Sequence, residues 1–208
     1  MCFGRRKYRE TAKNARTGRV NIAELATGDV ILFSNNWSDS TVKRKIRNVN
    51  GRLWLSGGIV VNNPKLFGEV MLLEHSVSSE DDDTLLTNTL DPSKADPDTR
   101  LVSLNARLNY PNYRVCLVRK INSNVTGLYQ RDPKIHTRIC AAFTRNIDNV
   151  QYTDPSQMLF HALSNSGLLK EGQQLPVDFT LADCAGTTLN EISCRSDLYS
   201  KGELYFRV

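Results

Sequence analysis

The sequence lacks the cysteine patterns that indicate a disulfide framework or a structural zinc site. Its five cysteines are odd in number, and no two of them are separated by only two residues. Unpaired cysteines of this kind are usual for proteins of a reducing compartment. We therefore expect an intracellular protein that resides in the cytoplasm or in an assembly made there.

Long apolar runs and targeting signals are also missing. No stretch approaches the length of a membrane span, and no secretory signal is present. The start, Met1-Cys2-Phe3-Gly4, lacks the glycine in second position that N-myristoylation requires. No cofactor-binding or metal-binding pattern is found, so the sequence predicts no cofactor, no metal site and no transmembrane segment.

The composition is that of one globular domain with a basic arm. The chain has 208 residues, of which 40% are hydrophobic and 24% charged, and its net charge is +5. Residues 1–19 hold seven lysines and arginines against one acidic residue, Glu10. Such an arm is suited to contact nucleic acid, an anionic surface or an acidic protein face, although a solvated tail has the same composition.

Residues 20–208 predict strands first and helices afterwards, which is the order of an α+β fold. Between the strand ending near 77 and the next element, residues 78–99 are acidic and contain proline, which predicts an inserted loop. Residues 101–108 are compatible with either a strand or a short helix. Strands are predicted at 30–33, 53–61, 70–77, 113–119 and 198–208, and helices at 136–147, 154–167 and from 180 onward.

The order of short motifs carries a resemblance to a known family. The motifs are Gly28–Phe33, Gly57–Val61, Leu73–Ser76, Tyr113–Arg119, Val150–Tyr152 and Asp183–Gly186. This series resembles the circularly permuted branch of the NlpC-type papain-like superfamily, which includes bacterial lipid-associated hydrolases, the lecithin:retinol acyltransferase group and poxviral members. The resemblance covers most of residues 20–195. It implies an α+β fold in which a small antiparallel sheet or barrel packs against helices.

The resemblance also implies a thiol site with a substitution in it. Cys184, at the start of a predicted helix, takes the position of the nucleophile, where the helix N-terminus favours a thiolate. Ser56 or Gly57 takes the position of the catalytic histidine, and Glu74 or His75 that of the orienting residue. A serine hydroxyl does not titrate near pH 7 and cannot replace imidazole as a general base.

Two alternatives could supply the imidazole that acts as the catalytic base. His75 could act on Cys184 directly, with Glu74 or Ser56 as a helper. Because Glu74 and His75 are adjacent in a predicted strand, their side chains should point to opposite faces, so at most one of them faces the site. His136 or His161, on predicted helices, is the second alternative. Cys116, Cys140 and Cys194 are interpreted as packing residues.

Three functions are compatible with these residues, and a non-catalytic protein is favoured over an enzyme. The first is a degenerate, non-catalytic papain-like protein with a structural or interaction role among other proteins, such as a minor capsid-associated protein within the virion of a large DNA virus. The alternative is a cysteine hydrolase or acyltransferase that cleaves an amide or ester with Cys184 and His75. The third is sequence-independent nucleic-acid binding through residues 1–19 and the basic residues between 43 and 47.

Overall fold

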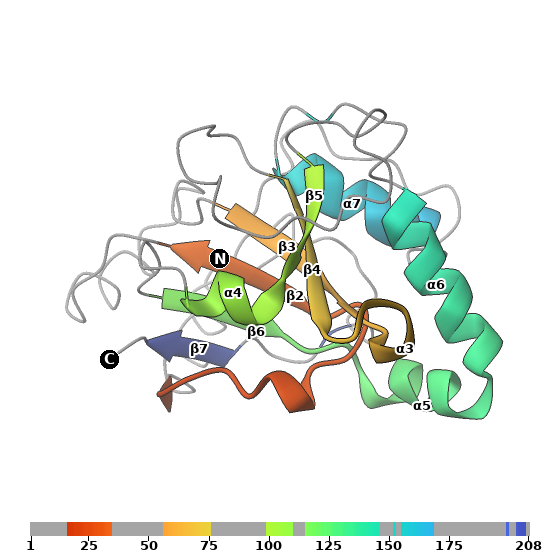
Figure 1. Ribbon diagram of the computed structural model, residues 1–208, viewed down its shortest axis with the longest axis horizontal. Coiled ribbons are helices and arrows are strands. Elements are labelled where there is room, and N and C mark those ends of the chain that lie inside the picture. Colours follow the sequence, from red (N-terminus) through yellow and green to blue (C-terminus); the bar gives the residue numbers. More distant parts are fainter. Residues whose placement is uncertain are drawn as a thin grey trace, which may run out of the picture.

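The computed structural model describes residues 16–34, 56–75, 99–109, 115–145, 152, 155–168, 199 and 203–206. Within these residues, helices pack on an open sheet that is antiparallel except at one edge (Figure 1). The α+β class predicted from the order of elements is therefore confirmed.

Most of the predicted strands and helices are present, but the helix at Ser123–Arg131 was not predicted, and the helix expected from 180 onward lies outside the described residues. The strands are β1 (Arg16–Thr17), β2 (Val30–Ser34), β3 (Ser56–Asn62), β4 (Val70–His75), β5 (Thr99–Ser103), β6 (Val115–Arg119) and β7 (Glu203–Phe206). The helices are the 3₁₀ turn η1 (Ile22–Glu24) and the α-helices α3 (Pro64–Phe67), α4 (Leu104–Asn109), α5 (Ser123–Arg131), α6 (Pro133–Arg145) and α7 (Pro155–Asn165). The segment from 101 to 108, left open above, is both: it ends β5 and forms most of α4.

The seven strands lie in the order β1-β7-β6-β2-β3-β4-β5. Strand β1 runs parallel to β7, and all other neighbours in the sheet are antiparallel. Arg16 and Thr17 pair with Tyr205 and Phe206, so the sheet includes part of the stretch expected to be a basic arm. Residues 1–15 and 76–98, the latter containing nearly all of the predicted acidic insertion, lie outside the described residues.

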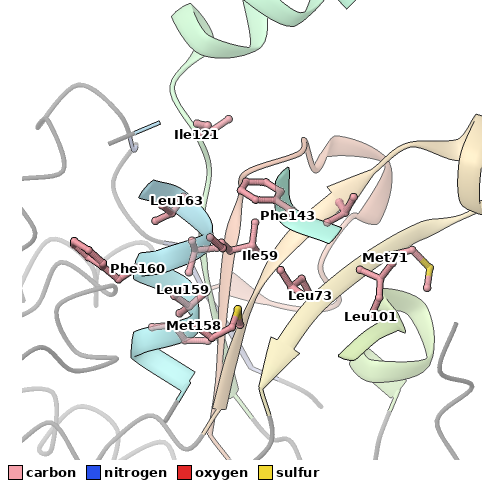
Figure 2. Close-up of a cluster of buried hydrophobic side chains, with 14 of the residues drawn as sticks. Ile59, Met71, Leu73, Leu101, Ile121, Phe143, Met158, Leu159, Phe160 and Leu163 are labelled. Carbon is pink, nitrogen blue, oxygen red and sulfur yellow. The ribbon is translucent and has the colours of Figure 1, made fainter. Parts of the chain in front are cut away.

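Both faces of the sheet are covered by hydrophobic clusters. On β2, Val30 and Leu32 point to one face, while Ile31 and Phe33 point to the other. Helices α6 and α7 pack on the first face, where Ile59, Leu73 and Leu159 of α7 belong to one hydrophobic cluster (Figure 2). Helix α4 lies against β4 and β5, and its Leu104 belongs to the second cluster. Burial on both faces explains why the central strands read as continuous apolar runs.

Gly58 marks a close approach of two backbones within this sheet. It pairs with Glu74 of β4, and a Cβ atom added at Gly58 would lie 2.5 Å from the carbonyl oxygen of Leu73 and 2.7 Å from Cγ of Leu72. Real Cβ atoms do not make contacts this short, so only glycine fits at this position. A glycine pair within a strand indicates a bulge or a close approach of two backbones, and Gly58 is at a close approach.

Replacing Gly58 with alanine should destabilise the protein, because the main chain of β4 would have to move. We expect a loss of about 1–3 kcal/mol in the free energy of unfolding, measured by chemical denaturation. Gly127, inside α5, is the matched control, since a Cβ there would meet only the Arg131 side chain at 3.7 Å. Gly127→Ala should be neutral or stabilising, by up to about 1 kcal/mol. Equal losses in the two variants would contradict the assigned packing of β3 on β4.

Candidate functional site

The Gly-Asp motif before β2 forms a turn whose carboxylate is buried. Oδ2 of Asp29 accepts a hydrogen bond from the amide of Ala26 at 2.8 Å, and Oδ1 accepts one from the amide of Ile121 at 2.7 Å. Burial raises the pKa of Asp29 to about 6, even though both hydrogen bonds favour the ionised form. Asp29 thus fastens the start of β2 to the chain just after β6, which is a structural role.

The same turn is also fixed to β3 and to the C-terminal part of the chain. The amide of Gly28 donates to the Val60 carbonyl at 2.9 Å, and the amide of Val60 donates to the Asp29 carbonyl at 2.8 Å. The Tyr199 hydroxyl donates to the Gly28 carbonyl at 2.9 Å. Gly28 has φ of +99°, a conformation that strongly favours glycine. The turn therefore aligns the strands that carry the predicted site residues.

Ser56, at the position expected for the catalytic histidine, begins β3. It pairs with Phe33 of β2 in the antiparallel register. Its hydroxyl oxygen is buried and has no hydrogen-bond partner among the described residues. Gly58, two residues on, pairs with Glu74, so Ser56 and Glu74 lie on the same face of the sheet.

Glu74 is fully buried and is held by two arginines. Its Oε1 accepts hydrogen bonds from Nε and Nη2 of Arg100 at 3.2 and 3.1 Å, and its Oε2 accepts one from Nε of Arg107 at 2.7 Å. The guanidinium of Arg107 also lies 5.5 Å from the centre of the Phe33 ring. Both carboxylate oxygens are thus engaged on the α4 side of the sheet, where they stabilise packing between β4, β5 and α4.

His75, the next residue along β4, points to the opposite face, as strand alternation predicted. Its Nδ1 lies 2.9 Å from the Thr99 hydroxyl oxygen, and only 2% of the residue is exposed. The His75 ring meets the Tyr152 ring edge to face at a centroid distance of 6.0 Å. Tyr152 in turn packs on His161 of α7 at 5.7 Å. His75 therefore lies with an aromatic group on the α7 side, separated by the sheet from Glu74.

Cys184 lies outside the described residues, as does the helix predicted to begin near it. The arrangement of Cys184 relative to His75 or Ser56 therefore stays a prediction.

The structure brings together another cysteine and histidine, which the sequence reasoning did not pair. Nε2 of His136 lies 2.8 Å from the Thr27 hydroxyl oxygen and 3.5 Å from Sγ of Cys140. His136 and Cys140 lie on the side of α6 that faces β3. Burial raises the pKa of the Cys140 thiol and lowers that of the His136 imidazole, so both groups are neutral near pH 7. A neutral, buried thiol is a poor nucleophile, and this cluster is structural. The spacing of four residues within one helix was the signal for the pair.

Other kinds of site find no support in the described part of the chain. It contains no group of three or more His, Cys, Asp or Glu side chains placed to hold a metal ion. None of its helices is both long enough and apolar enough to cross a membrane. Comparisons with protein-family models, with curated proteins and with solved structures find no match.

Removing the charge of Glu74 should be costly, because it leaves two buried guanidinium groups without their carboxylate. We expect Glu74→Gln to lower the free energy of unfolding by about 3–5 kcal/mol in chemical denaturation. Glu24→Gln is the control, since Glu24 pairs with Lys120 at the surface, with side chains 55% and 29% exposed. That change should cost less than about 1 kcal/mol. A Glu74 variant no less stable than the Glu24 variant would rule out a structural ion-pair cluster.

The raised pKa of Asp29 makes its contribution to stability depend on pH. Its folded-state pKa of about 6 exceeds the ordinary value of 3.8, so protonation stabilises the fold below about pH 4, and this gain is lost as the pH rises through about 6. The stability advantage of the wild type over Asp29→Asn should therefore shrink by about 1–3 kcal/mol between about pH 4.5 and 7.5. Denaturant titrations at several pH values measure this difference. An advantage that grows with pH would contradict the assignment.

Proposed function

We propose that this protein is a non-catalytic member of the permuted papain-like superfamily with a structural or interaction role. The observation that carries the proposal is the separation of Glu74 and His75 by the sheet, with both oxygens of Glu74 engaged by arginines. A thiol enzyme needs its imidazole and the group that orients it on the same face. Ser56, in the position of the histidine, cannot act as a base near pH 7.

The order of elements supports the papain-like part of the proposal. The Gly-Asp turn leads into β2, the glycine pair lies in β3, and Glu74 and His75 end β4. These three strands are consecutive and antiparallel, and β6 returns to the free side of β2. Helices α6 and α7 then cover one face of this sheet.

The charge distribution supports a role in an assembly. Basic residues are concentrated in residues 1–19 and acidic residues in residues 78–99. Segments of opposite charge on one chain are suited to bind protein partners, and a basic arm is also suited to contact an anionic surface or nucleic acid without sequence preference. Since the resembled branch has poxviral members, the specific form of the proposal is a minor capsid-associated protein of a large DNA virus, found in the cytoplasm or incorporated into the virion. This step is an analogy at the level of the fold.

A cysteine hydrolase or acyltransferase is the second candidate, and the environment of His75 favours it. The His75 ring is fixed by Thr99 and Tyr152, and a fixed ring is what a general base requires. In this alternative, Cys184 attacks an amide or ester carbonyl, and His75 takes up the thiol proton and then transfers it to the leaving group. Thr99 would act as the orienting residue in place of Glu74.

The reactivity of Cys184 distinguishes the two candidates. We expect iodoacetamide to label Cys184 in the folded protein with the pH dependence of an ordinary thiol, whose pKa is about 8.5. The rate should be the same in His75→Asn, because no imidazole activates the thiol. Labelling at each cysteine is followed by mass spectrometry over a range of pH, and Cys184→Ala identifies the signal.

Two buried cysteines in the same chain serve as internal controls. Cys116, whose pKa burial raises to about 12, and Cys140 should stay unlabelled while the fold is intact. Their labelling in His75→Asn would reveal unfolding and separate that effect from a loss of activation. Fast labelling of Cys184 that persists below about pH 7, and that falls in a folded His75→Asn variant, would overturn the non-catalytic proposal.

A further inference from the structure

The corner between α5 and α6 presents an unusual surface. Helix α5 ends at Arg131 and α6 begins at Pro133, so that only Asp132 separates the two helices. The amide of Asp132 donates to the Leu128 carbonyl at 2.8 Å, and its Oδ1 accepts from the amide of Lys134 at 3.0 Å. The corner is thus firmly built from its own hydrogen bonds, and it lies at the lower right of Figure 1, beside the sheet. We call it the corner surface; its residues are Leu128, Arg131, Asp132, Pro133, Lys134, Thr137 and Arg138.

The corner surface carries cations that no acidic group of the described residues neutralises. Lys134 and Arg138 are exposed and four residues apart, so they lie in one row along α6. Neither side chain forms a hydrogen bond or an ion pair in the described part of the chain. Arg131 is exposed as well, and its Nε donates to the Gly127 carbonyl at 3.1 Å. By contrast, Lys120 pairs with Glu24 at 2.9 Å.

Beside these cations the surface is hollowed and has an apolar contribution. An open hollow of about 640 Å³ is lined, among the described residues, by Asp132, Pro133, Lys134, Thr137 and Arg138. Leu128, one helical turn before Asp132, has 45% of its surface exposed and is the exposed large hydrophobic residue of the described chain. The cationic row beside the hollow is complementary in charge to an acidic segment, and the exposed leucine on the neighbouring helix offers an apolar contact.

We infer that the corner surface binds an acidic segment of a protein partner that carries apolar side chains next to its carboxylates. The carboxylates would pair with Lys134 and Arg138, and an apolar side chain would pack against Leu128 or Pro133. A nucleic-acid backbone fits less well, because it offers no apolar side chain to pack against Leu128 or Pro133, whereas a peptide can carry one next to its carboxylates. The inference rests on the proposed interaction role and names the chemistry of one partner.

A peptide of this chemistry tests the inference. The probe is a fluorescein-labelled peptide of sequence Glu-Leu-Asp-Asp-Leu-Asp, which combines four carboxylates with two leucines and does not occur in this chain. The full chain should bind it in fluorescence anisotropy, and raising the salt from about 0.05 to 0.3 M should weaken binding. A control peptide with Gln-Asn-Asn-Asn in place of the four acids should bind at least about tenfold more weakly.

Charge-reversal variants locate the binding surface. Lys134→Glu combined with Arg138→Glu should weaken peptide binding at least about tenfold, and Leu128→Ser should weaken it severalfold. The matched control is Arg19→Glu combined with Lys65→Glu, which changes the net charge equally at two exposed positions elsewhere. This control should reduce binding less than about twofold beyond the general effect of charge. Circular dichroism confirms that each variant is folded.

Several results would overturn the inference. These are no binding of the acidic peptide, equal binding of the uncharged peptide, or equal losses in the two double variants. Single-stranded DNA that binds more tightly than the peptide and depends on Lys134 and Arg138 would assign the surface to nucleic acid instead. These outcomes are separate from the proposed function, which the labelling of Cys184 decides. An activated Cys184 would remove the non-catalytic proposal without changing the peptide result.

Discussion

Asp29 places a carboxylate between two backbone amides that are far apart in the chain, those of Ala26 and Ile121. A buried carboxylate is costly unless it is hydrogen-bonded, and here the two amides offset part of that cost. The turn that contains it also bonds to Val60 of β3 and to Tyr199. The register of β2 with β3 and with β6, and hence the positions of Ser56, Glu74 and His75, depends on this one buried group.

The sheet also determines which groups those residues can contact. Hydrophobic clusters cover both of its faces, and the side chains of adjacent residues in a strand point to opposite faces. Glu74 joins Arg100 and Arg107 on one side, and His75 joins Thr99 and Tyr152 on the other. The charges nearest the expected site thus serve packing, whereas Lys134 and Arg138, at the corner of α5 and α6, are exposed and unpaired within the described part of the chain. This division is the basis of the proposed interaction role.

Local sequence patterns predicted the strands, helices and side-chain directions that depend on residues close together in the chain. The Gly-Asp turn before an apolar run predicted β2, the pattern at 154–167 predicted α7, and alternation along β4 placed Glu74 and His75 on opposite faces. Contacts that depend on strand register were not predictable in the same way. Arg107 reaches Glu74 across 33 residues, and Thr27 reaches His136 across 109. No sequence period links such residues, because the pairing of whole strands and helices brings them together.

The hydrogen bond from Tyr199 to the Gly28 carbonyl spans 171 residues, and β1 pairs with β7 over a similar distance. A ribosome makes the turn and β1 long before it makes their C-terminal partners, Tyr199 and β7. Contacts of such long range form slowly, and an unpaired strand edge invites association with other chains in the meantime. During synthesis, then, one side of β6 and all of β1 stay unpaired until β7 has been made. A chaperone, or a partner that covers this edge first, would protect the nascent chain from aggregation.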